Sequence, residues 1–115
     1  MAGLDIDARR EGPIALLKLS GEARLEVIDA LRSTARTLRT EGAKHFVLSL
    51  KDVKFVDSAS VGILLELQKE TTAGGGQLVL CAIPARIARM FDAMALTGRF
   101  RIAATEEKAR EACVP

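Results

Sequence analysis

Apolar and polar positions along the chain switch repeatedly between strand and helix spacing. Apolar residues over 4–9 and 14–19 flank the turn sequence Glu11-Gly12-Pro13, which predicts a hairpin that ends at Ser20-Gly21. Apolar residues from Leu25 to Leu38 then recur every three or four positions, which predicts a helix. The N-terminal third is therefore predicted to form two strands followed by one helix.

Strands and helices continue to alternate through the rest of the chain. The elements predicted there are a buried strand over 46–56, a helix from Ser58 to the glycines at 74–76, a strand over 78–83, a helix from Pro84 to Gly98, a short edge strand over 100–102 and a last helix over 106–112. Such alternation implies crossover connections and a largely parallel sheet, so an α/β fold is expected. The periodicity places the following residues in the core: Val47, Leu48, Leu64, Val79, Leu80 and Phe91.

Composition narrows the classes of protein that this chain can belong to. The 115 residues are 49% hydrophobic and 28% charged, which predicts a single globular domain over 1–115. A net charge of +2, without a large basic cluster, gives no reason to expect a nucleic-acid partner. No apolar run is long enough to span a membrane, and Asp5 and Asp7 lie where a signal peptide would be apolar. We therefore expect a cytoplasmic protein that does not insert into membranes.

The sequence contains no pattern typical of a catalytic or metal site. Cys81 lies in an apolar run and is expected to be buried, Cys113 is expected to be a free thiol, and neither has metal-ligand spacing. His45 is the only histidine, and no serine or cysteine pairs with it at a useful spacing. The chain is accordingly predicted to have no catalytic residue, metal or cofactor and not to be an enzyme.

The most informative segment is Asp57-Ser58-Ala59-Ser60-Val61-Gly62, at the junction between a predicted strand and helix. Asp57 or Ser58 could cap the helix, whose first amides lack partners within it. Alternatively, Ser58 is exposed and accepts a phosphate that a partner detects. A helix N-terminus tolerates such a charge, whereas a partner packed on the same surface would bind more weakly. The residues alone leave both interpretations open.

The chain resembles the STAS domain, and in particular the small anti-sigma-factor antagonists of bacteria. The strongest matches are Phe55-Val56-Asp57-Ser58-Ala59, Gly62, Gly75-Gly76 and Ala95-Leu96-Thr97. The resemblance covers essentially the whole chain. It implies a mixed, mostly parallel sheet of four or five strands in roughly sequential order, with the helices mainly on one side.

The resemblance also implies a function controlled by phosphorylation. Ser58 would be the acceptor, and its kinase would be the anti-sigma factor itself, a serine kinase of the histidine-kinase-like ATPase type. A sigma factor would be an indirect partner. The implied partner-binding residues are Gly21, Glu22, Arg24, Asp57, Ser58, Ala59, Ser60, Val61 and Gly62.

Two positions depart from the family pattern. Ser60 replaces a usual glycine, and Gly21-Glu22-Ala23-Arg24 ends in arginine where the family usually has aspartate. We expect Arg24 either to contact Asp57 or a phosphate on Ser58, or to point into solvent. Because a kinase adapted to an aspartate would meet a cation here, this reversal of charge predicts a dedicated partner.

Two other functions are compatible with the sequence. One is an unphosphorylated STAS adaptor, such as a subunit of a lipid-transport ATPase or of a signalling scaffold. The other is a nucleotide- or anion-binding module that uses the helix N-terminus at Ser58 together with Arg24.

Overall fold

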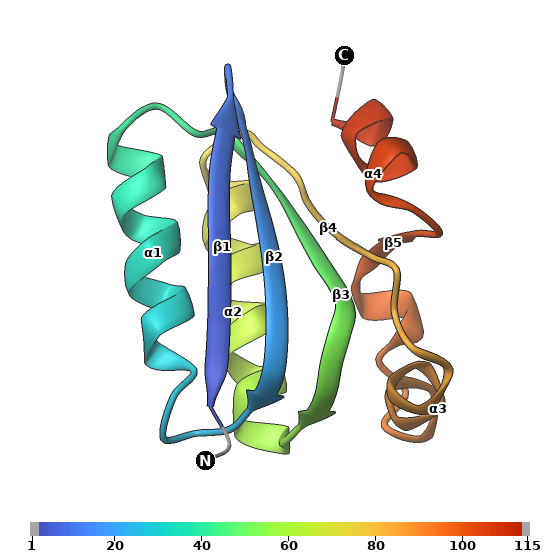
Figure 1. Ribbon diagram of the computed structural model, residues 1–115. Coiled ribbons are helices and arrows are strands. Elements are labelled where there is room, and N and C mark those ends of the chain that lie inside the picture. The colour runs from blue at the N-terminus through green and yellow to red at the C-terminus, as the bar shows by residue number, and fades with distance from the viewer. Residues whose placement is uncertain (1–2, 114–115) are drawn as a thin grey trace.

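A computed structural model describes residues 3–113, which form one five-stranded sheet flanked by helices (Figure 1). The elements in chain order are β1 (Leu4–Glu11), β2 (Ile14–Ala23), α1 (Asp29–Thr40), β3 (His45–Val56), α2 (Ser58–Ala73), β4 (Leu78–Cys81), α3 (Ala85–Ala93), the 3₁₀ turn η1 (Thr97–Arg99), β5 (Arg101–Ala103) and α4 (Glu106–Ala112).

The strands lie in the sheet in their order along the chain, β1-β2-β3-β4-β5. β1 pairs antiparallel with β2 through the predicted hairpin, while β2–β3, β3–β4 and β4–β5 are parallel pairs. Parallel neighbours require crossover connections, and α1, α2 and α3 provide them. The predicted α/β class, the mostly parallel sheet and the sequential strand order are confirmed.

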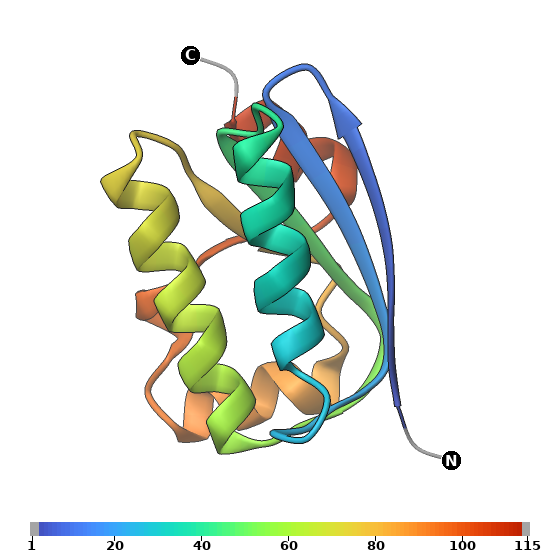
Figure 2. The same ribbon diagram turned by 90° about the vertical axis from the view of Figure 1, so that its left-hand side faces the viewer.

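The main core lies between one face of the sheet and helices α1, α2 and α3. Figure 2 shows α1 and α2 side by side in front of the sheet. Leu17, Leu48 and Leu80, from three neighbouring strands, are at most 1% exposed there, and Leu64 and Phe91 pack against them from the helices. Every residue that the sequence placed in the core is buried.

The opposite face of the sheet is covered by α4. This smaller cluster consists of Leu16, Val47, Val79, Cys81, Ala109 and Cys113. Both cysteines are buried and free, and burial raises the pKa of the Cys81 thiol to about 11. Cys81 therefore stays a protonated, unreactive thiol at neutral pH. The helices lie mainly, but not entirely, on one side of the sheet.

β2 does not end at Ser20-Gly21, as the sequence predicted, but continues to Ala23. The pairing with β3 is irregular at Gly21, whose φ is +100°. A side chain at Gly21 would also lie 2.1 Å from the Gly3 carbonyl oxygen. A glycine there lets the strand pass through a bulge instead of ending, and two further residues pair with β3.

α1 begins at Asp29, four residues later than the apolar spacing from Leu25 predicted. The amides of Val27 and Ile28 both donate to the Arg24 carbonyl, 2.9 Å away, so this segment forms a turn before the helix. Ile28 lies in this turn and also packs into the core. The apolar spacing therefore begins before the helix does, and it predicted a start that is too early.

β4 and α3 are shorter than predicted, and in both places an alanine adopts a left-handed conformation. β4 ends at Cys81 instead of Ile83, because Ala82 has a φ of +53°. α3 ends at Ala93 instead of near Gly98, because Ala95 has a φ of +57°.

The end of α3 is a Schellman motif built on Ala95. The Leu96 amide donates to the Phe91 carbonyl (2.8 Å), and the Ala95 amide donates to the Asp92 carbonyl (3.0 Å). These two bonds satisfy carbonyl groups that the helix end would leave unpaired. Leu96 and Phe91, which this turn brings together, are both buried in the main core.

Candidate functional site

Ser58 is the first residue of α2, a helix of 16 residues, as the sequence predicted. Asp57, not Ser58, is the N-cap: it has an extended backbone, and its Oδ1 accepts a hydrogen bond from the Ser60 amide at 2.8 Å. Ser58 is exposed, and its hydroxyl makes no hydrogen bond to any other residue in the 3–113 range. The capping role is therefore performed by the neighbouring residue, and the Ser58 hydroxyl is free for other chemistry.

Asp57 also joins the start of α2 to the loop after β2. Its Oδ2 accepts from the Leu25 amide at 2.8 Å, and its own amide donates to the Ala23 carbonyl at 3.0 Å. Burial raises the pKa of Asp57, but hydrogen bonds from Ser60 and from Leu25, together with the nearby Arg24 cation, outweigh it and hold the pKa below its ordinary value. At neutral pH Asp57 is therefore ionised, and its carboxylate links the start of α2 to the loop after β2.

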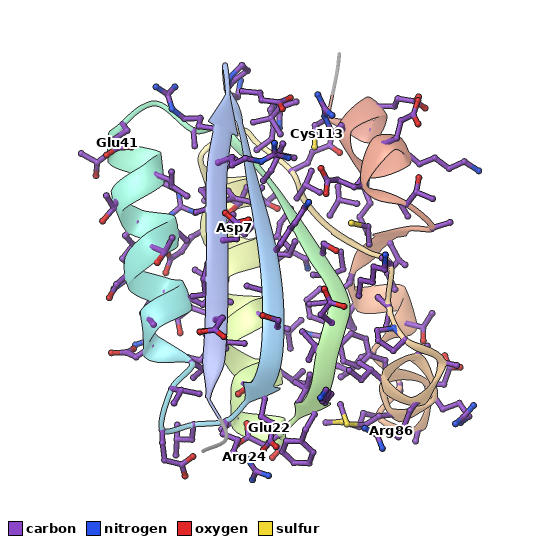
Figure 3. All side chains as sticks on the ribbon, viewed as in Figure 1. Asp7, Glu22, Arg24, Glu41, Arg86 and Cys113 are labelled. Atoms are coloured by element: carbon purple, nitrogen blue, oxygen red, sulfur yellow. The ribbon has the colours of Figure 1, made fainter. Side chains whose placement is uncertain are left out.

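The structure brings the two groups of predicted site residues to the same end of the sheet. Glu22 pairs in register with Phe55, and Ala23 with Val56, so the end of β2 runs beside the segment that leads into Ser58. In Figure 3 Glu22 and Arg24 lie together at the lower edge of the molecule.

The predicted site residues differ in how much of each faces solvent. Arg24, Ser58 and Gly62 are exposed, and Gly21, Glu22, Asp57 and Ala59 are half-buried. Ser60 and Val61 are buried, and Val61 belongs to the main core. The surface that a partner can reach is therefore formed by the exposed and half-buried members of the set.

Arg24 does not form the ion pair with Asp57 that the sequence suggested, while its contact with a phosphate on Ser58 stays a prediction. Its Nε donates to Glu22 Oε1 at 2.6 Å, and its guanidinium carbon lies 4.3 Å from the centre of the Phe55 ring. The side chain does not simply point into solvent, nor does it form an ion pair with Asp57. Two neighbours on the same surface, one acidic and one aromatic, hold the guanidinium group instead.

Ser60, the other departure from the family pattern, occupies a buried position. Its residue is 0% exposed, and its Oγ has no hydrogen-bond partner among residues 3–113. A buried, unpaired hydroxyl destabilises a fold because it loses its hydrogen bonds to water. A favourable neighbour of this hydroxyl is the Asp57 carboxylate, whose pKa the Ser60 side chain helps to lower.

Sequence reasoning missed two exposed apolar residues beside Ser58. Phe55 was assigned to a buried strand, yet 39% of its surface is exposed, and Leu25 is 61% exposed. A signal for Phe55 was available: Val53 and Val56 are three positions apart, so a regular strand cannot bury both on one face. This spacing requires a break in the alternation of buried and exposed side chains along β3. The irregular pairing of β2 with β3 provides that break.

The remaining candidate from the sequence, His45, lies away from this end of the sheet. His45 begins β3 at the opposite end from Ser58, and its Nδ1 accepts from the Gln77 amide at 3.1 Å. Across residues 3–113, no group of three His, Cys, Asp or Glu side chains could hold a metal ion. Within the same range, every helix is too short or too polar to cross a bilayer.

The model of the STAS domain matches residues 5–109, so the chain belongs to the STAS domain family. Similar curated proteins include the anti-sigma F factor antagonist of Paenibacillus polymyxa, which is 28% identical over 86% of this chain and 83% of its own length. Another is the anti-sigma-B factor antagonist of Staphylococcus aureus, at 22% identity over 77% of this chain and 82% of its own length.

Solved structures show the same fold. An anti-sigma factor antagonist from Mycobacterium paratuberculosis matches 96% of this chain and 94% of its own, with a TM-score of 0.80 and 18% identity. The unphosphorylated form of the anti-sigma factor antagonist SpoIIAA matches 94% of this chain and 96% of its own, with a TM-score of 0.78 and 18% identity.

Proposed function

We propose that this chain is an anti-sigma-factor antagonist that binds its anti-sigma factor through the surface around Ser58. Phosphorylation of Ser58 by that anti-sigma factor, a serine kinase of the histidine-kinase-like ATPase type, would end the interaction and return the sigma factor to its inhibitor. The chain acts in this scheme as a ligand and a kinase substrate, not as an enzyme. The names of the similar curated proteins support the proposal.

The free hydroxyl of Ser58 is the observation that carries the proposal. Because Asp57 caps α2, Ser58 is not needed for helix stability and can be modified without loss of the cap. A phosphate would add a charge of about −1.5 to −2 beside the ionised Asp57, at a helix N-terminus that tolerates it. The fold is therefore expected to persist, while a partner covering Ser58 would meet a bulky, hydrated dianion.

The first test is to mix the purified chain with each candidate anti-sigma kinase from the same genome, with and without ATP. We expect wild type to bind and then to lose affinity as Ser58 is phosphorylated. Ser58→Ala should bind equally well and resist ATP. Ser58→Asp should fold normally but bind at least about tenfold more weakly, which corresponds to about 1.4 kcal/mol.

Ser33→Asp is the matched control, because Ser33 is an exposed serine on α1. It should leave the affinity unchanged. Equal affinities of wild type and Ser58→Asp in calorimetry would exclude this surface as the docking site. Stable binding to a transport or scaffold protein that is indifferent to ATP and to both Ser58 variants would instead indicate the adaptor function.

A further inference from the structure

A basic hollow lies beside the Ser58 surface and extends to an element that the sequence did not connect with function. It has a volume of about 430 Å³ and lies between the ends of β2 and β3 and the helix α3. Its lining consists of Glu22, Arg24, Lys54, Phe55, Val56, Arg86, Ile87 and Met90. Figure 3 shows Arg86 on α3 at the same lower edge of the molecule as Glu22 and Arg24.

The charges around the hollow are unbalanced. Three cations, Arg24, Lys54 and Arg86, face a single carboxylate, Glu22, which already pairs with Arg24. Among residues 3–113, neither Lys54 nor Arg86 takes part in an ion pair. Two positive charges are thus left without a counter-charge, and they favour an anionic occupant and disfavour a cationic one.

The inner surface of the hollow is apolar, and part of it is accessible. Phe55 is 39% exposed, Met90 is half-buried, and Ile87 closes the hollow against the core. An aromatic ring that is partly exposed within a rim of cations is typical of an anchor point for a partner's apolar side chain.

Contacts within the protein hold two of the three cations around the hollow. Arg86 Nη2 donates to the Lys54 carbonyl at 2.5 Å, which ties α3 to the end of β3. On the other side, Glu22 and the Phe55 ring orient the guanidinium group of Arg24. These contacts favour particular orientations of Arg24 and Arg86, which reduces the side-chain entropy that a partner must overcome on binding.

We propose that this basic hollow is a docking site for a protein segment that presents an apolar side chain next to carboxylates. In the proposed function, on which the identity of this partner rests, the segment belongs to the anti-sigma factor. The docking surface then extends from the Ser58 junction across Phe55 to α3, and Lys54 and Arg86, which are unpaired among residues 3–113, select an acidic partner.

The first experiment needs no knowledge of the partner. The ¹⁵N-labelled chain is titrated at low ionic strength with the peptide acetyl-Glu-Leu-Glu-Leu-Asp-amide and with its counterpart that has lysine at each acidic position. We expect the acidic peptide alone to shift the amide signals of residues 54–56 and 86–90. Equal shifts from both peptides, or no shifts at these residues, would overturn the proposal.

Charge-reversal variants give the matched comparison. Arg86→Glu and Lys54→Glu should each weaken binding of the acidic peptide about tenfold. Arg89→Glu makes the same change on the same helix, at an exposed residue outside the hollow, and should alter the affinity by a factor of about two at most. Because Arg86 also bonds to the backbone of β3, thermal melts of each variant must first show an intact fold. Lys54→Glu, whose side chain makes no such bond, keeps the test valid if Arg86→Glu unfolds.

The same variants distinguish this proposal from the proposed function. If wild type binds an anti-sigma factor and Arg86→Glu and Lys54→Glu bind it equally well, the hollow is not a docking site and the proposed function stands. If no anti-sigma factor binds but the acidic peptide shifts the hollow as expected, the docking site stands and its partner belongs to another class of protein.

Discussion

At the scale of single residues, Asp57 and Ser58 have different roles: Asp57 caps α2, and this leaves the Ser58 hydroxyl free for modification or for contact with a partner. Asp57 satisfies two backbone amides, one on α2 and one on the loop after β2, while the Ser58 hydroxyl makes no hydrogen bond to any other residue among 3–113. The sequence could identify this pair as a cap and a candidate acceptor, but it could not assign the two roles. Either side chain can cap a helix, and only the backbone conformation of each residue decides between them.

Asp57→Ala should lower the free energy of unfolding by about 1 kcal/mol at pH 7, since the cap of α2 is lost. Because the folded-state pKa of Asp57 lies below the ordinary value of 3.8, its contribution is present above that pH and disappears as the pH falls through the folded-state value. Urea unfolding at pH 7 and at about pH 3 should therefore show a smaller difference between wild type and variant in acid.

Asp52→Ala is the control for this prediction. Asp52 lies on β3, the strand that leads to Asp57, is exposed, and its side chain accepts no hydrogen bond from residues 3–113. It should change stability little at either pH. A cost for Asp57→Ala that is equally large in acid would mean that packing, not the ionised cap, explains the effect.

At the scale of elements, the sequence predicted the number and order of strands and helices well and some of their ends poorly. The apolar spacing specifies which faces are buried, and this is enough to recognise each element. It contains little information on where the backbone changes conformation. The two alanines with positive φ, Ala82 and Ala95, illustrate this limit. An alanine rarely adopts a left-handed conformation, so the sequence does not predict a turn at either position.

Ala95→Gly should stabilise the chain by about 0.5–1 kcal/mol. Relief of the left-handed conformation contributes about 1–2 kcal/mol, and the greater freedom of glycine in the unfolded chain removes about 0.5–1 kcal/mol of that gain. The midpoint of thermal unfolding should rise by about 2–4 °C. Ala93→Gly, at the last residue of the same helix, should lower it, and a lower midpoint for both variants would contradict the Schellman motif at Ala95.

At the scale of the whole molecule, one sheet separates two layers of unequal size. The larger core, under α1, α2 and α3, contains most of the buried residues, whereas α4 covers a smaller cluster on the other face. The sequence predicted this layout only in part. It identified α4, but α4 follows the last strand and is not part of a crossover, so the handedness rule for crossovers does not fix the face that it covers.

Leu80→Ala should lower the free energy of unfolding by about 2–5 kcal/mol, because Leu80 belongs to the larger core and is 0% exposed. Ile102→Ala is the matched control, since Ile102 is paired with Leu80 on the neighbouring strand but is 41% exposed. It should have a clearly smaller effect in chemical denaturation. If the two variants lost similar amounts of unfolding free energy, the difference in burial between Leu80 and Ile102 would not explain their contributions to stability.

The order of the strands has a consequence for how the chain folds during synthesis. Since each strand pairs with the one made before it, a newly made segment always finds its neighbour in the sheet already present. Most long-range pairing therefore closes only one helix-containing loop at a time, which keeps the entropic cost of each step low. Once residues 1–73 have left the ribosome, β1, β2, β3 and α2 are all available to fold. The start of α2 and the loop after β2, which Asp57 joins, are then both present. The α3 wall of the basic hollow comes last, so we expect the Ser58 surface to form on the nascent chain before the hollow beside it is complete.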